Sequence, residues 1–335
     1  MTPTSSDSYT VRRFQPDDAP GISALVRQVY GDTYLVHPEI YHPDQIIELN
    51  RDGRLISAVA VDAGGQVVGH YALERPDLGV IAESGEAMVL PEHRGHRLLE
   101  RMRPVLLERA RQLGLNGVFG KPVTNHVYSQ KLYRHYDGHP CGINLGEVPK
   151  AFHNMAAALT QRLSTLLYFQ YLQPPERVHI HVPDHHRAMI EQIYGRFEIT
   201  VEPGASAPPR GQGRLTVDNI ETVRDGIMRV HEIGTDTADA IRQAKQRLCA
   251  AGAEVLYLGL PLAHPATPFL AEAVEAEGFF FSGIGPYFLP EGDSLRYQFL
   301  KEDLDLHALQ IENSFARELL DYVSRERDRV TRLAR

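Results

Sequence analysis

The 335-residue sequence has no long hydrophobic run and only two cysteines. Because no stretch of about 18 apolar residues occurs, we expect no transmembrane helix and no membrane partner. The first ten residues are polar and lack the apolar stretch of a signal peptide. Cys141 and Cys249 lie far apart in the sequence and are too few for a disulfide framework. These absences predict a reducing, cytoplasmic location.

The sequence also lacks an excess of basic residues. It has 35 Lys and Arg against 43 Asp and Glu, a formal net charge of −8 at neutral pH. Nucleic acid is therefore not an expected partner, because binding phosphates requires a basic face. The hydrophobic fraction of 43% and the charged fraction of 23% are typical of a globular protein. The length exceeds that of one ordinary hydrophobic core, so we expect two domains.

The first 150 residues alternate strand-like and helix-like segments. The turn sequence Ala63-Gly64-Gly65-Gln66 separates two apolar runs and predicts a hairpin. The order β-α-α-β-β-β-α-β-α indicates an α+β (mixed α/β) fold, with helices packed on the faces of a mixed sheet. The expected strands are 9–14, 55–62, 67–73, 83–90 and 118–122, and the expected helices are 19–30, 43–52, 98–113 and 127–136.

The second half follows an expected helical linker and alternates in a similar way. The linker spans 151–175, with a helix over 152–167, and includes the pair Pro174-Pro175. A second domain would then occupy 176–300, and a charged C-terminal helix would occupy 301–335. In the second domain the expected strands are 178–182, 215–217, 227–231, 255–260 and 279–284, and the expected helices are 185–194, 237–251 and 268–277.

One segment of the first half has the features of an anion-binding site. A strand ends near Leu90, the turn Pro91-Glu92-His93-Arg94-Gly95 follows, and a helix begins at Leu98. The first turn of a helix has unpaired N–H groups and the positive end of the helix dipole. Phosphate groups bind at such sites, and Arg94 would add charge-assisted hydrogen bonds. From the residues alone, an ordinary surface turn remains an open interpretation.

This segment resembles motif A of the GNAT acyltransferases. The motif reads Arg/Gln-x-x-Gly-x-Gly/Ala after a strand that ends in Val-x-Pro, and Arg94 matches its first position. The sequence departs from the motif at two positions. Arg97 replaces the usual glycine, and Leu99 replaces the usual glycine or alanine. Either side chain would crowd a pyrophosphate, unless Arg97 itself binds it.

A second resemblance, to GNAT motif B, lies downstream over residues 124–133. That motif commonly reads Asn-x-x-Ala-x-x-Leu-Tyr. His126 takes the Asn position, Ser129 the Ala position, and Leu132-Tyr133 the final pair. The two motifs occur in the family's order, and together the resemblance covers roughly residues 8–148. It implies a GNAT domain in residues 1–150.

The two halves share a strand–helix–strand succession, which is weak evidence for an internal repeat. Segments 83–90, 98–113 and 118–122 correspond to 227–231, 237–251 and 255–260. The chain resembles two-domain bacterial GNAT proteins, so we expect tandem GNAT-like domains, each a mixed, mostly antiparallel sheet flanked by helices. In the second half, the turn around Gly234 corresponds to the turn of Arg94, but it has no basic residue that could bind pyrophosphate. The second domain is therefore expected to be degenerate, with two roles open: shaping the acceptor pocket or forming a homodimer.

The resemblance implies transfer of an acyl group from acetyl-CoA, as co-substrate, to an amine by direct attack in a ternary complex. The acceptor is a small molecule or a protein, and no metal is implied. The strand backbone near Met88 and Val89 would pair with the pantetheine arm. The residues implied in cofactor binding are Met88, Val89, Arg94, Gly95, His96, Arg97, Leu98, Leu99, His126 and Ser129.

Two residues are the candidates for acid–base chemistry. Glu83 lies where several members of the family have their general base, and Tyr133 matches the tyrosine that protonates the departing thiolate. Glu86 is a weaker candidate, because strand alternation places it on the face opposite Glu83. The structural alternatives remain open: Glu83 as a solvated edge residue and Tyr133 as a packing residue of an amphipathic helix.

Histidines gather in two further places. His179 and His181 would share one strand face, next to His185 and His186, but no Cys or suitably spaced carboxylate completes a metal site. We expect surface histidines there, not a metal. The loop between the first two helices contains Tyr30, Tyr34, His37, Tyr41 and His42, and the resemblance places the acceptor pocket near it.

The residues and the resemblance leave two functions open. The first is an acyl-CoA-dependent N-acyltransferase that is active in the N-terminal domain. The alternative is a non-catalytic regulatory module that binds acyl-CoA or a protein partner, which the departures at Arg97 and Leu99 favour.

Overall fold

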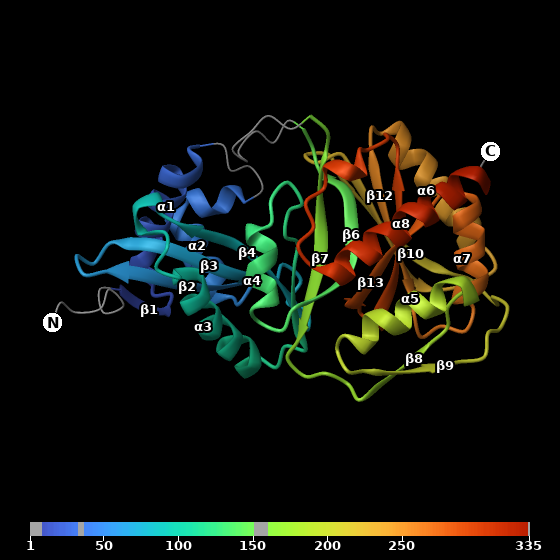
Figure 1. Cartoon of the computed structure of the whole chain (residues 1–335), viewed down its shortest axis with the longest axis horizontal. Helices are drawn as coiled ribbons and strands as arrows, with labels where there is room; N and C mark the ends of the chain where they lie inside the picture. The colour runs from blue at the N-terminus through green and yellow to red at the C-terminus, as the bar shows by residue number, and fades with distance from the viewer. Residues whose placement is uncertain (1–8, 33–36, 151–159, 334–335) are drawn as a thin grey trace. The chain divides into compact units, whose positions relative to one another are not determined.

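The computed structural model describes residues 9–32, 37–150 and 160–333 (Figure 1). Within these ranges the chain forms two compact units. Unit 1 extends to Gly120, and unit 2 begins at Lys121. The division therefore falls earlier than the expected domain boundary near residue 150. Among the described helices, none is both long and apolar enough to cross a membrane.

Unit 1 contains a sheet with the strand order β1-β2-β3-β4-β5. The first three pairings are antiparallel, and β5 is parallel to β4. The strands are β1 (Tyr9–Arg13), β2 (Leu55–Asp62), β3 (Val67–Glu74), β4 (Ile81–Val89) and β5 (Gly117–Gly120), and the α-helices are α1 (Ala19–Tyr30), α2 (Pro43–Arg51) and α3 (Leu98–Gln112). The expected hairpin between β2 and β3 is confirmed, with Asp62 Oδ1 accepting hydrogen bonds from two turn amides.

The helices of unit 1 cover both faces of its sheet (Figure 1). α3 packs on β1, β2 and β3, whereas α1 packs on β3 and β4. On the α3 face, the buried Arg103 donates hydrogen bonds to Tyr71 Oη at 2.9 Å and to Ser84 Oγ at 3.3 Å. Because side chains alternate along a strand, His70 and Glu74 of β3 lie on the opposite face from Tyr71. That opposite face contains the candidate site.

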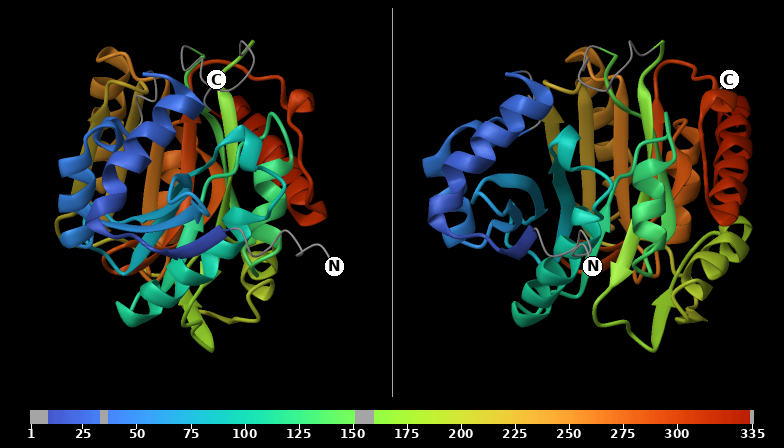
Figure 2. Two further views of the ribbon diagram at one scale, coloured as in Figure 1. Left: turned by 90° about the vertical axis from the view of Figure 1, so that its left-hand side faces the viewer. Right: turned by 60° about the vertical axis from the view of Figure 1, so that its left-hand side comes forward.

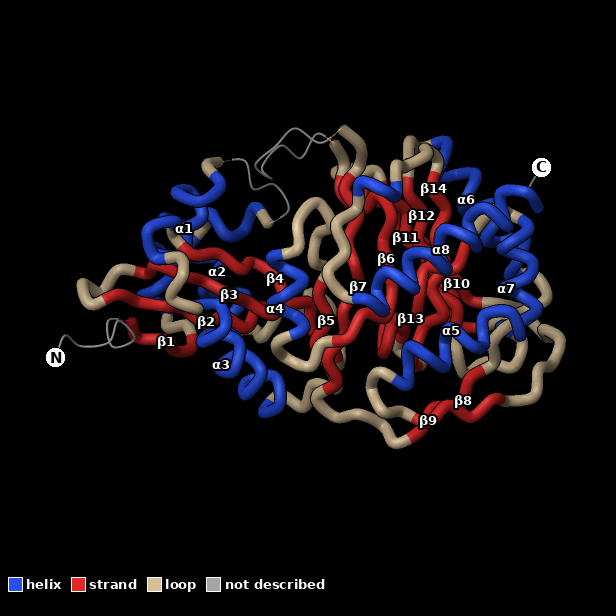
Figure 3. Tube along the Cα trace, in the orientation of Figure 1, coloured by secondary structure: helices blue, strands red, loops and turns tan. Residues whose placement is uncertain are grey.

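In unit 2 the sheet has the strand order β7-β6-β13-β14-β12-β11-β10 (Figure 3). All neighbouring pairs are antiparallel except β11 and β12. A short parallel pair, β8 with β9, lies apart from this sheet. The strands are β6 (His139–Val148), β7 (Leu163–Tyr171), β8 (Arg177–Ile180), β9 (Thr200–Pro203), β10 (Arg214–Ile220), β11 (Asp225–Glu232), β12 (Val255–Pro261), β13 (Phe280–Leu289) and β14 (Gly292–Leu300).

The helices of unit 2 include one long C-terminal helix. This helix packs along β6 and β13 (Figure 2), burying Phe315, Leu319 and Val323 at helical spacing. The α-helices are α4 (Tyr128–Arg134), α5 (Asp184–Gly195), α6 (Thr237–Ala250), α7 (Thr267–Ala276) and α8 (Ser314–Leu333). The expected C-terminal helix therefore begins at Ser314, not near residue 301, after a short 3₁₀ turn at Leu306–Ala308.

The helical linker expected over 151–175 is wrong where the structure describes it. Residues 151–159 lie outside the described ranges, and β7 follows from Leu163 to Tyr171. This apolar run is buried along almost its whole length, and periodicity cannot separate a buried strand from a buried helix. Pairing with β6 and the buried ion pair of Arg162 with Asp225, at 2.9 Å, hold the segment extended. The strands β6, β9 and β14 were not expected from the sequence.

The strand–helix–strand succession that the two halves share in sequence is also found in the structure. In unit 1, β4 and β5 are parallel neighbours joined by α3, and in unit 2, β11 and β12 are parallel neighbours joined by α6. Two parallel strands need a crossover connection, usually a helix. The expected fold class, mixed and mostly antiparallel sheets flanked by helices, is confirmed.

Candidate functional site

The expected anion-binding turn joins β4 to α3 in unit 1. The Arg94 Nε atom donates a hydrogen bond to the Val89 carbonyl at 3.2 Å, which ties the turn to the end of the strand. Gly95 has a φ of +85°, a conformation that glycine adopts without steric cost. The helix then begins at Leu98, and its first-turn amides have no partner within the helix. Arg94 and Gly95 are both exposed, so this turn can be reached by a ligand from solvent.

The two departures from motif A have different consequences. Arg97 is the N-cap of α3 and has a φ of +56°, the left-handed region that favours glycine. Its exposed side chain forms an ion pair with Glu100, one helical turn further along. The Leu99 side chain is half-buried on the first turn of α3. The backbone thus takes the conformation of a glycine position even though an arginine is present.

Part of β4 has an open edge. β5 pairs with β4 only at Ile81, Ala82 and Glu83, and no other described strand pairs with β4 on that side. The remainder of β4, through Met88 and Val89, pairs with β3 alone. Backbone groups on the open side can therefore pair with an extended ligand, as strand addition to a sheet edge does. The residues expected to contact a pantetheine arm lie along this edge.

A β-bulge in β4 changes the position of Glu86. The β3–β4 register shifts between His70 and Ala72, so that two residues of β4 oppose one residue of β3. Glu86 has a φ of +50°, which is strained for a residue with a side chain. The bulge breaks strand alternation, and the Glu86 carboxyl group lies 4.0 Å from His37 Nδ1 and 3.6 Å from His70 Nδ1. The expectation that Glu86 and Glu83 point to opposite faces is therefore wrong.

Glu86 is an unusual carboxyl group. It is 4% exposed, and its Oε2 atom has no hydrogen-bond partner among the described residues. Burial, followed by the negative charge of Glu39, raises the pKa of Glu86 to about 8. A carboxyl group with a pKa near the working pH can both take up and release a proton. Strain and a perturbed pKa at one residue are typical of functional sites.

A buried polar chain positions the His70 ring beside Glu86. Asn50 Nδ2 donates to Ser57 Oγ at 3.2 Å, and Ser57 Oγ lies 3.0 Å from His70 Nε2. Burial lowers the pKa of His70 to about 3, so its imidazole is neutral. When Ser57 donates to Nε2, the ring proton resides on Nδ1, and we assign this tautomer to the ionised state of Glu86. An N–H group would then face the Glu86 carboxylate.

Carboxyl groups surround His37 on the same face of the sheet. The Nδ1 atom of His37 lies 3.4 Å from Glu39 Oε1 and 3.4 Å from Glu74 Oε2. Glu83 is paired with Glu74 across the two strands, so its side chain shares this face. Burial disfavours the charged form of His37, but the hydrogen bond to Glu39 and the charges of Glu74, Glu39 and Glu83 outweigh it and raise its pKa.

This group of His37, Glu39, Glu74, Glu83 and Glu86 is called the acidic cluster below. Of these five residues, the sequence indicated only Glu83 and Glu86 as catalytic candidates. His37 belongs to the loop that the resemblance places near the acceptor. Glu74 is the last residue of β3, one position beyond the strand expected from the sequence, and it pairs with Glu83 of β4. Tyr34, another residue of that loop, lies outside the described residues.

The expected motif B residues lie in unit 2. Tyr133 is buried in α4, with its ring 5.5 Å from that of Tyr168. His126 is half-buried, and burial lowers its pKa. The start of α4 is fixed by the buried Gln130, whose Nε2 donates to the carbonyls of Val123, His126 and Gln310. The roles expected for Tyr133, His126 and Ser129 stay predictions.

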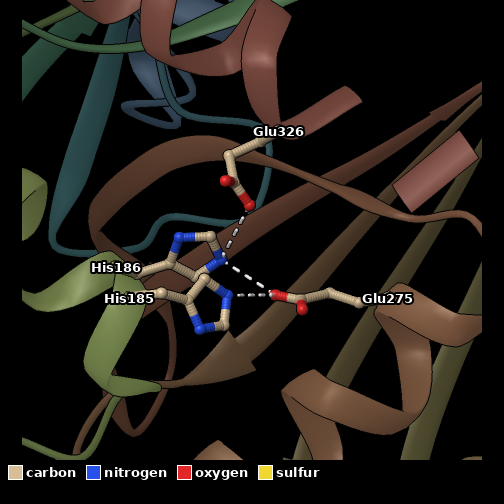
Figure 4. Close-up of side chains that lie close together, drawn as sticks. All are labelled: His185, His186, Glu275 and Glu326. Carbon is tan, nitrogen blue, oxygen red and sulfur yellow. Dashed lines mark hydrogen bonds and ion pairs between the residues drawn. The ribbon is translucent and has the colours of Figure 1, made fainter. Parts of the chain in front are cut away.

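The four histidines considered as metal ligands do not gather in unit 2. His179 lies beside Glu202, whereas His185 and His186 face Glu275 and Glu326 (Figure 4). The ligating atoms of His185, His186, Glu275 and Glu326 all lie within 4.8 Å of one another. The guanidinium of Arg329, however, already bonds Glu275 Oε2 and Glu326 Oε2, each at 2.7 Å. Arg329 thus supplies the positive charge that a metal would bring.

This network joins four elements of unit 2. Glu275 of α7 accepts hydrogen bonds from His186 of α5 at 2.9 Å, from Tyr297 of β14 at 3.0 Å and from Arg329 of α8. The Glu275 side chain is 3% exposed. Burial disfavours the ionised form, but hydrogen bonds from His185, His186 and Arg329 outweigh it and hold the pKa of Glu275 well below its usual range. The network anchors the C-terminal helix.

We expect Glu275→Gln to lower the free energy of unfolding by about 3 kcal/mol at neutral pH, because it leaves buried cationic partners uncompensated. A depressed carboxyl pKa contributes stability that is present above the ordinary value near 4.5 and is lost as pH falls below it. The deficit of the variant should therefore shrink in acid. Urea unfolding at several pH values checks this, with the exposed Glu272→Gln on the same helix as control. Equal stability of Glu275→Gln and the parent would contradict it.

Comparison with known proteins gives structural matches only. No protein-family model matches the chain, and no curated protein matches its sequence. An N-acetyltransferase from Staphylococcus aureus Mu50 matches 50% of this chain and 100% of its own, at 16% identity and a TM-score of 0.41. A GCN5-related N-acetyltransferase from Kribbella flavida covers 50% and 99%, at 24% identity and a TM-score of 0.39.

A ribosomal-protein-alanine N-acetyltransferase from Brucella melitensis covers 49% of this chain and 99% of its own, at 22% identity and a TM-score of 0.39. Each of these proteins is therefore matched along nearly its whole length by about half of this chain. All three of these proteins are described as N-acetyltransferases.

Proposed function

We propose that the chain is an acyl-CoA-dependent N-acyltransferase whose general base and CoA-binding turn lie in unit 1. The observation that carries the proposal is Glu86, a buried carboxyl group at a strained bulge, on a strand with one open edge. The same strand leads into the turn of Arg94 and Gly95 at the start of α3. An edge for pantetheine, a helix terminus for pyrophosphate and a base for the amine thus belong to one strand–turn–helix segment.

In the proposed reaction, the amine nitrogen attacks the thioester carbonyl carbon of acetyl-CoA. A carbon–nitrogen bond forms and the carbon–sulfur bond breaks. The proton that the amine loses passes to Glu86, directly or through one water molecule. The departing thiolate gains a proton, the role that the resemblance to motif B implies for Tyr133. The role of base thus moves from Glu83, the sequence-based candidate, to Glu86, because Glu86 has the pKa suited to it.

A free-thiol assay with acetyl-CoA and a panel of amines tests the proposal, together with calorimetry of CoA binding. Thiol release that depends on an added amine would support it. Binding of CoA without turnover on any amine would favour the non-catalytic module. The sequence supports that module through Arg97 and Leu99, which depart from motif A. No binding of CoA would refute the acyltransferase and would leave only a module that binds a protein partner.

We expect Arg94→Ala to weaken CoA binding by about 1.5–3 kcal/mol, the range for hydrogen bonds to charged groups. Arg94 lies in the turn before α3, outside the buried core, so its loss should not disturb the fold. Calorimetry of CoA binding measures the change. Arg111→Ala, at the exposed opposite end of α3, removes the same charge away from the turn and serves as control. Unchanged affinity in Arg94→Ala would remove Arg94 from the site.

A further inference from the structure

The acidic cluster has more carboxyl groups than one catalytic base requires. Glu39 and Glu74 lie beside the imidazole of His37, and Glu86 Oε1 lies 4.0 Å from His37 Nδ1. Side-chain exposure increases along this series, from 1% at Glu86 to 17% at Glu74 and 33% at Glu39. The cluster therefore extends from a buried base towards solvent and is not confined to the protein surface.

An independent observation shows that the buried end of the cluster is prepared for a ligand. Glu86 Oε2 is inaccessible and has no hydrogen-bond partner among the described residues. A buried carboxyl oxygen without a partner costs free energy in the folded protein. His70 Nδ1 faces this oxygen but lies 3.6 Å from it, beyond hydrogen-bond distance, so the Glu86 side chain is positioned but not satisfied. An N–H group of a bound amine would satisfy it.

The charges of the cluster favour one class of amine. Three carboxyl groups, those of Glu39, Glu74 and Glu83, lie around His37 in addition to Glu86. Even with His37 protonated, these side chains include more carboxylates than cations. A monoamine has a single nitrogen, which must sit at Glu86 in order to react. A second ammonium group on the same molecule could reach the half-buried Glu39.

We propose that the acceptor is an aliphatic diamine or polyamine, with its reacting nitrogen at Glu86 and a second ammonium group bound by Glu39 and Glu74. This proposal rests on the proposed function, since it specifies the substrate of the same site. The ligating atoms of His37, Glu39 and Glu86 lie within 4.8 Å of one another, so the two nitrogens need only a short aliphatic spacer. Glu39 is then a specificity residue and Glu86 the catalytic one.

The test compares diaminobutane with butylamine, which has the same carbon chain but one nitrogen. For the parent protein, we expect kcat/KM in the thiol-release assay to be at least about 10-fold higher for diaminobutane, the value of one charge-assisted hydrogen bond. Glu39→Gln should remove this preference, so that the ratio of kcat/KM for the two amines falls to about 1. The absolute value of kcat/KM for butylamine also changes, because the charge of Glu39 contributes to the raised pKa of Glu86. Glu48→Gln, on the outer face of α2, makes the same charge change outside the cluster and should keep the preference.

The outcomes separate the two proposals. Equal kcat/KM for both amines in the parent protein, or an equal loss for both in Glu39→Gln, would overturn the diamine proposal and leave N-acyl transfer intact. Calorimetry of diaminobutane binding, with EDTA present to exclude a divalent cation bound by the same residues, gives a readout that needs no turnover. Binding that depends on Glu39 without thiol release from any amine would support the cation site and overturn the acyltransferase proposal.

Discussion

Replacing Glu86 by glutamine is expected to reduce turnover by about 10²- to 10⁴-fold, the usual contribution of a positioned general base. The glutamine keeps the shape of the side chain but cannot accept the proton of the amine. CoA affinity should change little, because the turn around Arg94 and the open edge of β4 are unaffected. Steady-state kinetics with a confirmed acceptor, together with calorimetry of CoA binding, measure both quantities.

The pH dependence gives this prediction a specific signature. Because the pKa of Glu86 is raised to about 8, kcat/KM in the parent protein should increase as pH rises through that value and the carboxylate forms. The residual activity of Glu86→Gln should lack this step. Glu83→Gln, on the same strand and face, is the matched control. A larger loss in Glu83→Gln than in Glu86→Gln would return the role of base to Glu83.

Glu86→Gln should also affect stability, in the opposite direction to activity. The folded pKa of Glu86 lies above its usual value near 4.5, so its favourable contribution is present below pH 4.5 and is lost as pH rises to about 8. Glutamine does not titrate, and the variant should therefore gain stability relative to the parent protein as pH increases. A gain in stability with a loss of turnover separates a functional residue from a structural one.

Tyr133→Phe is the second substitution with a large expected effect. If its phenol protonates the departing thiolate, turnover should fall by about 10²- to 10⁴-fold. The lower end is expected, because a thiolate is a fairly good leaving group near neutral pH. Tyr133 is buried beside Tyr168, and phenylalanine keeps this ring packing. CoA affinity and the unfolding temperature should therefore change little, as calorimetry and thermal unfolding can show.

Two other tyrosines near α4 serve as controls for Tyr133. Tyr128 is 77% exposed at the start of the helix, and Tyr136 is half-buried just after its end. Neither corresponds to the tyrosine of motif B, so Tyr128→Phe and Tyr136→Phe should retain turnover. Full activity of Tyr133→Phe on a confirmed substrate would show that the general-acid assignment is wrong.

Much of the local structure of unit 1 could be predicted from the sequence, including the turn proposed to bind CoA. The hairpin turn after Asp62, the amphipathic helix α1 and the Arg94-Gly95 turn before α3 all depend on residues close together in the chain. Turn chemistry, helical periodicity and glycine preference act over a few residues, so they can be read without a fold. The crossover helix α6 of unit 2 could be predicted in the same way.

Elements that depend on distant partners were not predictable in this way. The run from Leu163 to Tyr171 was expected to be partly helical, but it is a buried strand paired with β6. β14 also had no local signal, although it lies between β12 and β13 in the sheet. Buried segments are apolar on all sides, and their secondary structure is decided by which backbone groups they pair with.

The sequence by itself determined that this protein has a turn suited to an anion, with glutamates in the preceding strand. Only the tertiary structure decided which glutamate has the chemistry of a base. The bulge moves Glu86 onto the face of Glu83 and buries it beside His70, and His37 arrives from a separate part of the chain. A pKa depends on burial and on neighbouring charges, and both are set by residues remote in sequence, which no local pattern records.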